Sequence, residues 1–207
     1  MGKTISTIFP AVKAVGEELA DRIFYLTAKT ITATVAKETF ALLEKNGYRA
    51  KTIQITAKEK LCPCDEMECN PVTCPYAKGH FDRVNDAVFD LLHRCEMIAR
   101  DAILSQADRY TVCPFELCLD TASWCDNVIC DYNYVFDPNV YLKRFFQEGI
   151  KGDYIFLIDE AHNMVERSRQ MYSAQIYKED FLTVKRIMKE HSRSIEKALE
   201  KCNKILQ

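Results

Sequence analysis

The sequence lacks an excess of positive charge. Its 28 lysines and arginines are slightly outnumbered by 30 aspartates and glutamates, which gives a formal net charge of -2. Long-range attraction to nucleic acid depends on summed charge, so no global field steers this chain onto a polyanion. Any contact with nucleic acid must therefore come from a local basic patch.

Long hydrophobic runs and a secretion signal are also missing. The longest apolar stretches, such as Tyr154–Ile158, are far shorter than the ~20 residues that a membrane span needs. The N-terminal segment has only broken apolar runs and no cleavage site made of small residues. We therefore expect a cytoplasmic protein without a membrane partner.

The spacing of apolar residues predicts a parallel α/β sheet. Helical periodicity covers residues 5–20 and 31–46, and β-rich runs cover residues 22–27 and 51–56. Strands that alternate with helices in this way are typical of parallel sheets. The composition, 48% hydrophobic and 28% charged without repeats or low-complexity linkers, agrees with a globular domain of this class.

The α/β rhythm breaks over residues 57–126, which we interpret as an insertion containing a helix over 81–106. It resumes with a strand at 127–132. A helix over 137–148, beginning at an Asp-Pro pair, and a strand at 154–158 follow. This last strand is a continuous apolar run, which is typical of a central strand covered on both faces.

Ten cysteines are the unusual feature of the composition. In a reducing compartment, clustered cysteines hold a metal more often than they form disulfides. The clustered thiols include Cys62, Cys64, Cys69, Cys74 and Cys113. The paired C-x₂-C knuckles typical of zinc sites are missing, which favours an iron–sulfur cluster and leaves zinc as the alternative. Cys95 and Cys130 are expected in the core, whereas Cys118 and Cys125 stay ambiguous.

The chain begins with half of a phosphate-binding motif. Gly2, Lys3 and Thr4 match the last three positions of G-x-x-x-x-G-K-[ST], with a helix expected behind them. In such a loop the glycine lets the backbone wrap phosphate, the lysine contacts phosphate and the hydroxyl binds Mg²⁺. The preceding strand and first glycine are absent, so an ordinary exposed N-terminus is the alternative interpretation.

An acidic pair follows the strand expected at 154–158. Asp159 and Glu160 would lie at the carboxyl end of a parallel sheet, where nucleotides bind. Aspartate can hold Mg²⁺, glutamate can orient the attacking water, and His162 can report the nucleotide state to other parts. The structural alternative is an aspartate that caps a helix, and the DEAH sequence after an apolar strand disfavours it.

Several motifs follow one another along the chain. They are GKT at 2–4, YLTAKT at 25–30, LC…CPYAKGHFDR at 61–83, CPFEL at 113–117, CDYNYVFDP at 130–138 and IDEAHN at 158–163. In this order they resemble the iron–sulfur superfamily 2 helicases of the DinG/XPD type, as far as about residue 168. The resemblance implies a RecA-like parallel sheet of the P-loop type, with a cysteine-rich, mainly helical insertion and a helical C-terminal extension.

The resemblance also implies roles for individual residues. The matched ligands of a [4Fe-4S] cluster are Cys62, Cys69, Cys74 and Cys113, with Cys64 as an extra thiol. The matched nucleotide-binding residues are Gly2, Lys3, Thr4, Asp159, Glu160 and His162, with Asp159 and Glu160 catalytic. The matched DNA contacts are Thr27, Lys29, Thr30 and Lys58. Lys58 stands where relatives often have an arginine, and its ammonium lacks the planar fork of a guanidinium.

The same comparison divides the chain into four expected parts. They are the first part of motor domain 1 at 1–56, the iron–sulfur insertion at 57–126, the rest of motor domain 1 at 127–170 and the start of a helical arch-like domain at 171–207. From residue 178 onward, charged helices present an apolar face that no later segment covers. We therefore expect missing neighbours, including a second motor domain.

By this resemblance the function is an ATP-dependent DNA helicase that moves 5′ to 3′ along single strands and opens junctions in DNA repair or replication. Its expected cofactors are a [4Fe-4S] cluster, ATP and Mg²⁺. Half a phosphate loop and no second motor domain predict a piece that is inactive by itself. The alternatives are a metal-stabilised nucleic-acid-binding module without ATPase activity and a P-loop kinase, which the DEAH box and the cysteines disfavour.

Overall fold

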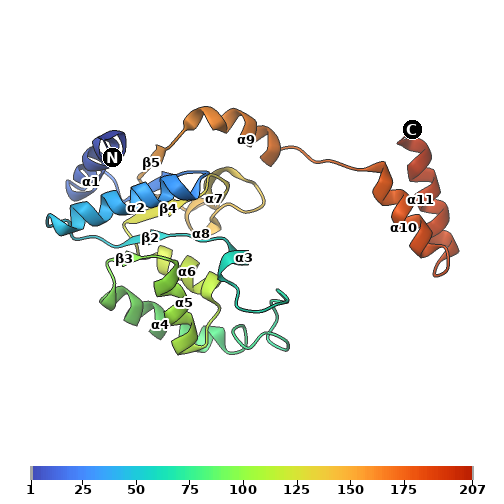
Figure 1. Cartoon of the computed structure of the whole chain (residues 1–207), viewed down its shortest axis with the longest axis horizontal. Helices are drawn as coiled ribbons and strands as arrows, with labels where there is room; N and C mark the ends of the chain where they lie inside the picture. Colours follow the sequence, from blue (N-terminus) through green and yellow to red (C-terminus); the bar gives the residue numbers. More distant parts are fainter. Residues whose placement is uncertain (1, 207) are drawn as a thin grey trace. The chain divides into compact units, whose positions relative to one another are not determined.

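A single sheet of five parallel strands, in the order β3-β2-β4-β1-β5, organises the larger part of the chain (Figure 1). The computed structural model describes residues 2–206, apart from the side chain of Thr30. The strands are β1 (Arg22–Leu26), β2 (Thr52–Gln54), β3 (Met97–Ile98), β4 (Asn127–Cys130) and β5 (Tyr154–Ile158). The expected parallel α/β sheet is thereby confirmed.

Helices precede, connect and follow these strands along the chain. They are α1 (Gly2–Gly16), α2 (Thr30–Lys45), α3 (Lys58–Leu61), α4 (His80–Arg94), α5 (Arg100–Tyr110), α6 (Pro114–Ala122), α7 (Asn133–Phe136), α8 (Lys143–Phe146), the 3₁₀ turn η1 (Ala161–Asn163) and α9 (Met164–Met171). Helices α1 and α2 lie on one side of the sheet, whereas α5 and α6 lie on the opposite side (Figure 1).

Strand β1 buries both of its faces because its side chains alternate between two cores. Ile23 and Tyr25 pack with residues of α1 and α2, among them Ile8 and Phe40. Phe24 points to the opposite side and is fully buried. Its ring contacts Phe145, Phe146, Tyr154 and Phe156 at centroid distances of 5.3, 5.1, 5.3 and 5.5 Å. The period of two along a strand produces this division.

Strand β5 differs from its prediction as a central strand covered on both faces. It lies at the edge of the described sheet and pairs only with β1 among the described strands. Ile155 and Leu157 pack against the core under α1 and α2, but Phe156 is 40% and Ile158 38% exposed. A continuous apolar run shows that both faces suit burial, but it does not reveal which strands are neighbours.

Two predicted helices are also wrong. The helix expected over 81–106 is interrupted at β3, because the backbone there pairs with β2: the Thr52 N–H donates to the Glu96 carbonyl at 2.9 Å. Of the helix expected over 137–148, only the short helix α8 forms, and turns precede it. There the Asp137 carboxylate accepts a hydrogen bond from the Asn139 N–H at 2.8 Å, which closes a turn instead of capping a helix.

A second compact unit begins at Glu166, and the first ends at Val165. In the second unit, α10 (Lys178–Met188) and α11 (Arg193–Ile205) pack against each other, and Lys185 pairs with Glu200 at 3.7 Å. The apolar face expected to be uncovered is therefore partly covered within this pair. Across the described residues, no helix combines the length and the hydropathy that crossing a membrane requires. The domain boundaries predicted inside the first unit remain predictions.

Candidate functional site

A pocket at the carboxyl end of β5 brings together residues from the two ends of the first unit. Lys3 and Thr4 come from the first turn of α1, and Asp159 directly follows β5. The cavity has a volume of about 220 Å³ and is also lined by Thr7, Tyr25, Phe156, Leu157 and Ile158. The structure thus places three of the predicted nucleotide-binding residues around one cavity.

Tyr25 also lines this pocket, where its side chain interacts with those of Thr4 and Asp159, and it was not among the predicted site residues. Burial raises the pKa of its phenol, and the negative charge of Asp159 raises it further. A side-chain hydrogen bond with Thr4 acts in the opposite direction. Its place on β1, facing α1 and α2, follows from strand alternation, but its electrostatic interaction with Asp159 depends on the order of the strands.

The remaining predicted nucleotide residues lie outside the lining of this pocket. Gly2 is exposed, and a Cβ at this position would meet no atom within 4 Å, so packing does not require glycine here. Glu160 and His162 are both exposed, and their side chains approach each other at 3.4 Å. The backbone of Glu160 is in the left-handed region with φ of 51°, a conformation that non-glycine residues rarely adopt.

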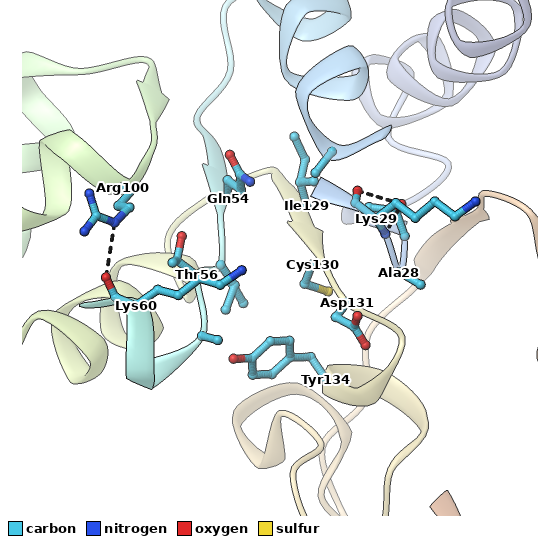
Figure 2. Close-up of a pocket in the computed structure, with 14 residues that line it drawn as sticks. Ala28, Lys29, Gln54, Thr56, Lys60, Arg100, Ile129, Cys130, Asp131 and Tyr134 are labelled. Atoms are coloured by element: carbon cyan, nitrogen blue, oxygen red, sulfur yellow. Dashed lines mark hydrogen bonds between the residues drawn. The ribbon is translucent and has the colours of Figure 1, made fainter. Parts of the chain in front are cut away.

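A polar groove lies at the same edge of the sheet as this pocket, at the carboxyl ends of β1, β2 and β4 (Figure 2). Its volume is about 270 Å³. Its polar lining consists of Thr27, Lys29, Gln54, Thr56, Lys60, Arg100, Asp131 and Tyr134. Parallel strands direct their carboxyl ends to one edge of a sheet, which explains why segments far apart in sequence meet here.

Only some of the predicted DNA contacts line this groove. Thr27 and Lys29 line the groove, and the buried Thr27 hydroxyl shapes the turn by accepting the Lys29 N–H at 3.3 Å. Lys58 is not part of the lining. It lies against the Cys69 thiol, whose hydrogen bond raises the pKa of the Lys58 ammonium. The side chain of Thr30 lies outside the described part of the structure.

Two cations of the groove were missed in the sequence. Lys60 lies in α3 and Arg100 begins α5, and the Arg100 Nε donates to the Lys60 carbonyl at 3.1 Å (Figure 2). Arg100 was assigned to the middle of a long helix, where nothing marked it as a site residue. The break at β3 places it at a helix start facing the groove. Only the tertiary structure shows that these two segments meet.

The clustered cysteines lie in the loop after α3 and at the start of α6. All ten cysteines are free, and the Cys64 and Cys74 sulfurs are 4.0 Å apart. Partial desolvation, followed by the neighbouring Cys74 thiol, raises the pKa of Cys64 to about 11. Cys69 acts electrostatically on both Lys58 and Cys113, which places these three groups together. Across residues 2–206, however, no three His, Cys, Asp or Glu side chains are arranged as metal ligands.

Three other cysteines belong to the core. Cys118, Cys125 and Cys130 are buried, and burial raises the pKa of Cys118 and of Cys125 to about 12. Such thiols are inert hydrophobic residues rather than metal ligands. The prediction for Cys130 is confirmed, whereas Cys95 is only half-buried and the prediction that it is a core residue is wrong. The ambiguity of Cys118 and Cys125 is resolved in favour of packing.

The chain contains an α/β domain that is consistent with a RecA-like domain. Its parallel sheet has Lys3 and Thr4 at the start of a helix, Asp159 after a strand, and the polar groove at the same edge. The DEAD_2 family model matches residues 32–181, which is more than half of the chain. The chain therefore belongs to the DEAD_2 family, and the predicted similarity to superfamily 2 helicases of the XPD/DinG type is confirmed.

Two relatives are similar to parts of this chain. The chain is 31% identical over 108 residues to the general transcription and DNA repair factor IIH helicase subunit XPD/RAD3 of Saccharomyces cerevisiae, which covers 52% of this chain and 13% of that protein. It is 27% identical over 74 residues to the Fanconi anemia group J protein homolog of Gallus gallus, covering 36% of this chain and 6% of that protein. The chain thus spans a small part of each relative.

Proposed function

We propose that this chain forms part of a cytoplasmic ATP-dependent DNA helicase that couples ATP hydrolysis to 5′-to-3′ movement along single-stranded DNA and to unwinding at junctions in DNA repair or replication. The observation that carries this proposal is the proximity of two polar sites at one edge of one sheet. The pocket of Lys3, Thr4 and Asp159 suits Mg²⁺ and phosphate, and the groove of Lys29 and Arg100 suits a nucleic-acid backbone.

In the nucleotide pocket, the Lys3 ammonium and the Thr4 hydroxyl are the groups suited to phosphate and Mg²⁺, and the Asp159 carboxylate is suited to the same metal. Glu160 and His162 extend into solvent beside it. In the complete protein, we propose that Glu160 orients the attacking water when a second motor domain closes over this face.

The clustered cysteines are suited to a soft metal, because thiolates are soft ligands and two separate segments bring these free thiols near each other. We propose that Cys62, Cys69, Cys74 and Cys113 hold a [4Fe-4S] cluster. Iron–thiolate bonds at these four positions would tie the loop after α3 to the start of α6. Arg100 begins α5, the helix that precedes α6. The cluster would therefore make α6 a rigid neighbour that holds Arg100 beside the groove.

The nucleotide proposal is tested by Lys3→Ala. We expect the affinity for an ATP analogue with Mg²⁺, measured by isothermal titration calorimetry, to fall at least about tenfold, because hydrogen bonds to charged groups contribute about 1.5–3 kcal/mol. Lys13→Ala is the matched control: Lys13 lies on the same helix but pairs with Glu17 at 3.5 Å away from the pocket lining. Equal affinity in the Lys3 variant and the wild type would refute the assignment.

The groove proposal is tested by Arg100→Ala. We expect weaker binding of oligothymidine in fluorescence anisotropy, and a slope of log affinity against log salt that is smaller by about 0.7, since one phosphate contact on a single strand is lost. Arg49→Ala is the control with the same charge change, because Arg49 is exposed and precedes β2 at the amino end of the sheet. If both variants lose the same affinity, the effect comes from net charge and the groove is not the binding site.

A further inference from the structure

One buried side chain connects the walls of the two sites. Tyr132 follows β4 and is only 1% exposed. Its hydroxyl donates a hydrogen bond to the backbone carbonyl of Asp159 and lies 3.5 Å from the carbonyl of Glu160. Strand β1 lies between β4 and β5. The Tyr132 side chain therefore reaches across the carboxyl end of β1 to the turn after β5.

The turn after β4, which carries Tyr132, forms part of the groove wall. Asp131 directly precedes Tyr132, Tyr134 follows it after Asn133, and both Asp131 and Tyr134 line the groove (Figure 2). The Asp131 carboxylate accepts the Asn133 N–H at 2.9 Å, and the Tyr132 carbonyl accepts the Val135 N–H at 3.0 Å. These bonds make the segment a fixed turn, so a displacement of the groove wall also displaces the ring of Tyr132.

The turn after β5, whose carbonyls accept the hydrogen bond of the Tyr132 hydroxyl, is sensitive to such a displacement. Asp159 lines the nucleotide pocket, and its N–H donates to the Leu26 carbonyl at 2.9 Å. Glu160 adopts its left-handed conformation immediately afterwards. A strained conformation of this kind persists only where surrounding contacts maintain it. Within the described residues, the Tyr132 hydroxyl is the side-chain group that bonds to the carbonyls of both acidic residues.

We infer that Tyr132 is a positioning residue that couples the groove to the nucleotide pocket. A single strand bound against Asp131 and Tyr134 shifts the turn after β4. The Tyr132 hydroxyl passes this shift to the carbonyls of Asp159 and Glu160, and the Asp159 carboxylate moves relative to Lys3 and Thr4. Nucleotide in the pocket acts on the groove by the same route in reverse, because coupling between two binding sites is reciprocal. This inference rests on the proposed function.

The test measures the affinity of the whole chain for a non-hydrolysable ATP analogue with Mg²⁺, with and without saturating oligothymidine. We expect oligothymidine to change the wild-type affinity at least about fivefold. In Tyr132→Phe, which keeps the ring and removes only the hydroxyl, each ligand should still bind alone and the ratio should fall to about one. The matched control is Tyr48→Phe, whose lost hydroxyl bonds to Asn127 at the amino end of β4.

The outcomes separate this inference from the proposed function. A fivefold ratio that persists in Tyr132→Phe, or a wild-type ratio of one with both ligands bound, overturns the coupling role and leaves the two sites in place. A wild-type chain that binds neither ligand overturns the proposed function and the coupling role together. A merely structural role for the hydroxyl predicts the same ratio in the Tyr132 and Tyr48 variants.

A measurement on the wild type keeps the inference testable if Tyr132→Phe does not fold. Hydrogen–deuterium exchange of residues 158–163 is followed while oligothymidine is added without nucleotide. We expect the protection of this turn to change when the groove is occupied. Unchanged exchange at saturating oligothymidine would show that the signal does not reach the turn.

Discussion

Replacing Cys113 with serine is expected to reduce the iron content of the anaerobically purified chain from about four atoms to nearly none, because a cubane cluster needs four thiolates and a serine hydroxyl is a poor substitute. The fold at this position should survive. Cys113 is the N-cap of α6 and Pro114 follows it, and serine is among the preferred N-cap residues. Loss of iron would therefore report a lost ligand rather than a lost helix.

Iron, sulfide and zinc analysis, together with the absorption spectrum, provides the measurement, and circular dichroism checks the fold. Cys202→Ser is the matched control, because Cys202 lies in α11 of the second unit. It should keep the full iron content. Unchanged iron in the Cys113 variant would remove this residue from the ligand set. One zinc and no iron in the wild type would give the cysteines a structural role.

Replacing Phe24 with alanine is expected to lower the free energy of unfolding of the first unit by about 3–5 kcal/mol. Phe24 is fully buried in the middle of β1, and its ring contacts four aromatic rings from α8 and β5. Alanine would leave a cavity that these large rings cannot fill without leaving their positions. The substitution removes both the apolar contacts and the favourable edge-to-face geometry.

Urea unfolding followed by tryptophan fluorescence measures this effect, because the only tryptophan, Trp124, lies in the first unit. Phe81→Ala is the matched control: the Phe81 ring is 85% exposed, so its loss should change the free energy by less than about 0.5 kcal/mol. Equal effects of the two substitutions would show that the aromatic cluster around Phe24 does not stabilise the sheet.

The sequence predicted the nature of the elements well where local periodicity is strong. The strands at β1, β4 and β5 and the helix α2 follow from apolar runs and helical spacing. It failed where tertiary pairing competes with local preference. The segment around β3 has a helical pattern on both sides, yet pairing with β2 makes it extended, and the Asp137 carboxylate closes a turn rather than opening a helix.

In the candidate site, too, the sequence predicted the chemical character of side chains but not their neighbours. The sequence by itself predicted a nucleotide-binding role for Lys3, Thr4 and Asp159, since these side chains carry their donors and acceptors wherever they lie. It also predicted that Cys130 is a core residue, but it left Cys118 and Cys125 ambiguous, and only their burial in the structure shows that they are core. The parallel sheet implied in addition that the carboxyl ends of the strands share one edge.

Only the tertiary structure decided which side chains meet at that edge. The strand order places β1 between β4 and β5, and this brings Tyr25 to Asp159 and lets Tyr132 reach the same turn. It also brings Arg100 to the groove and directs Lys58 to Cys69. Periodicity records which face of an element is apolar, but neighbours are chosen by the packing of all elements together, which no local pattern contains.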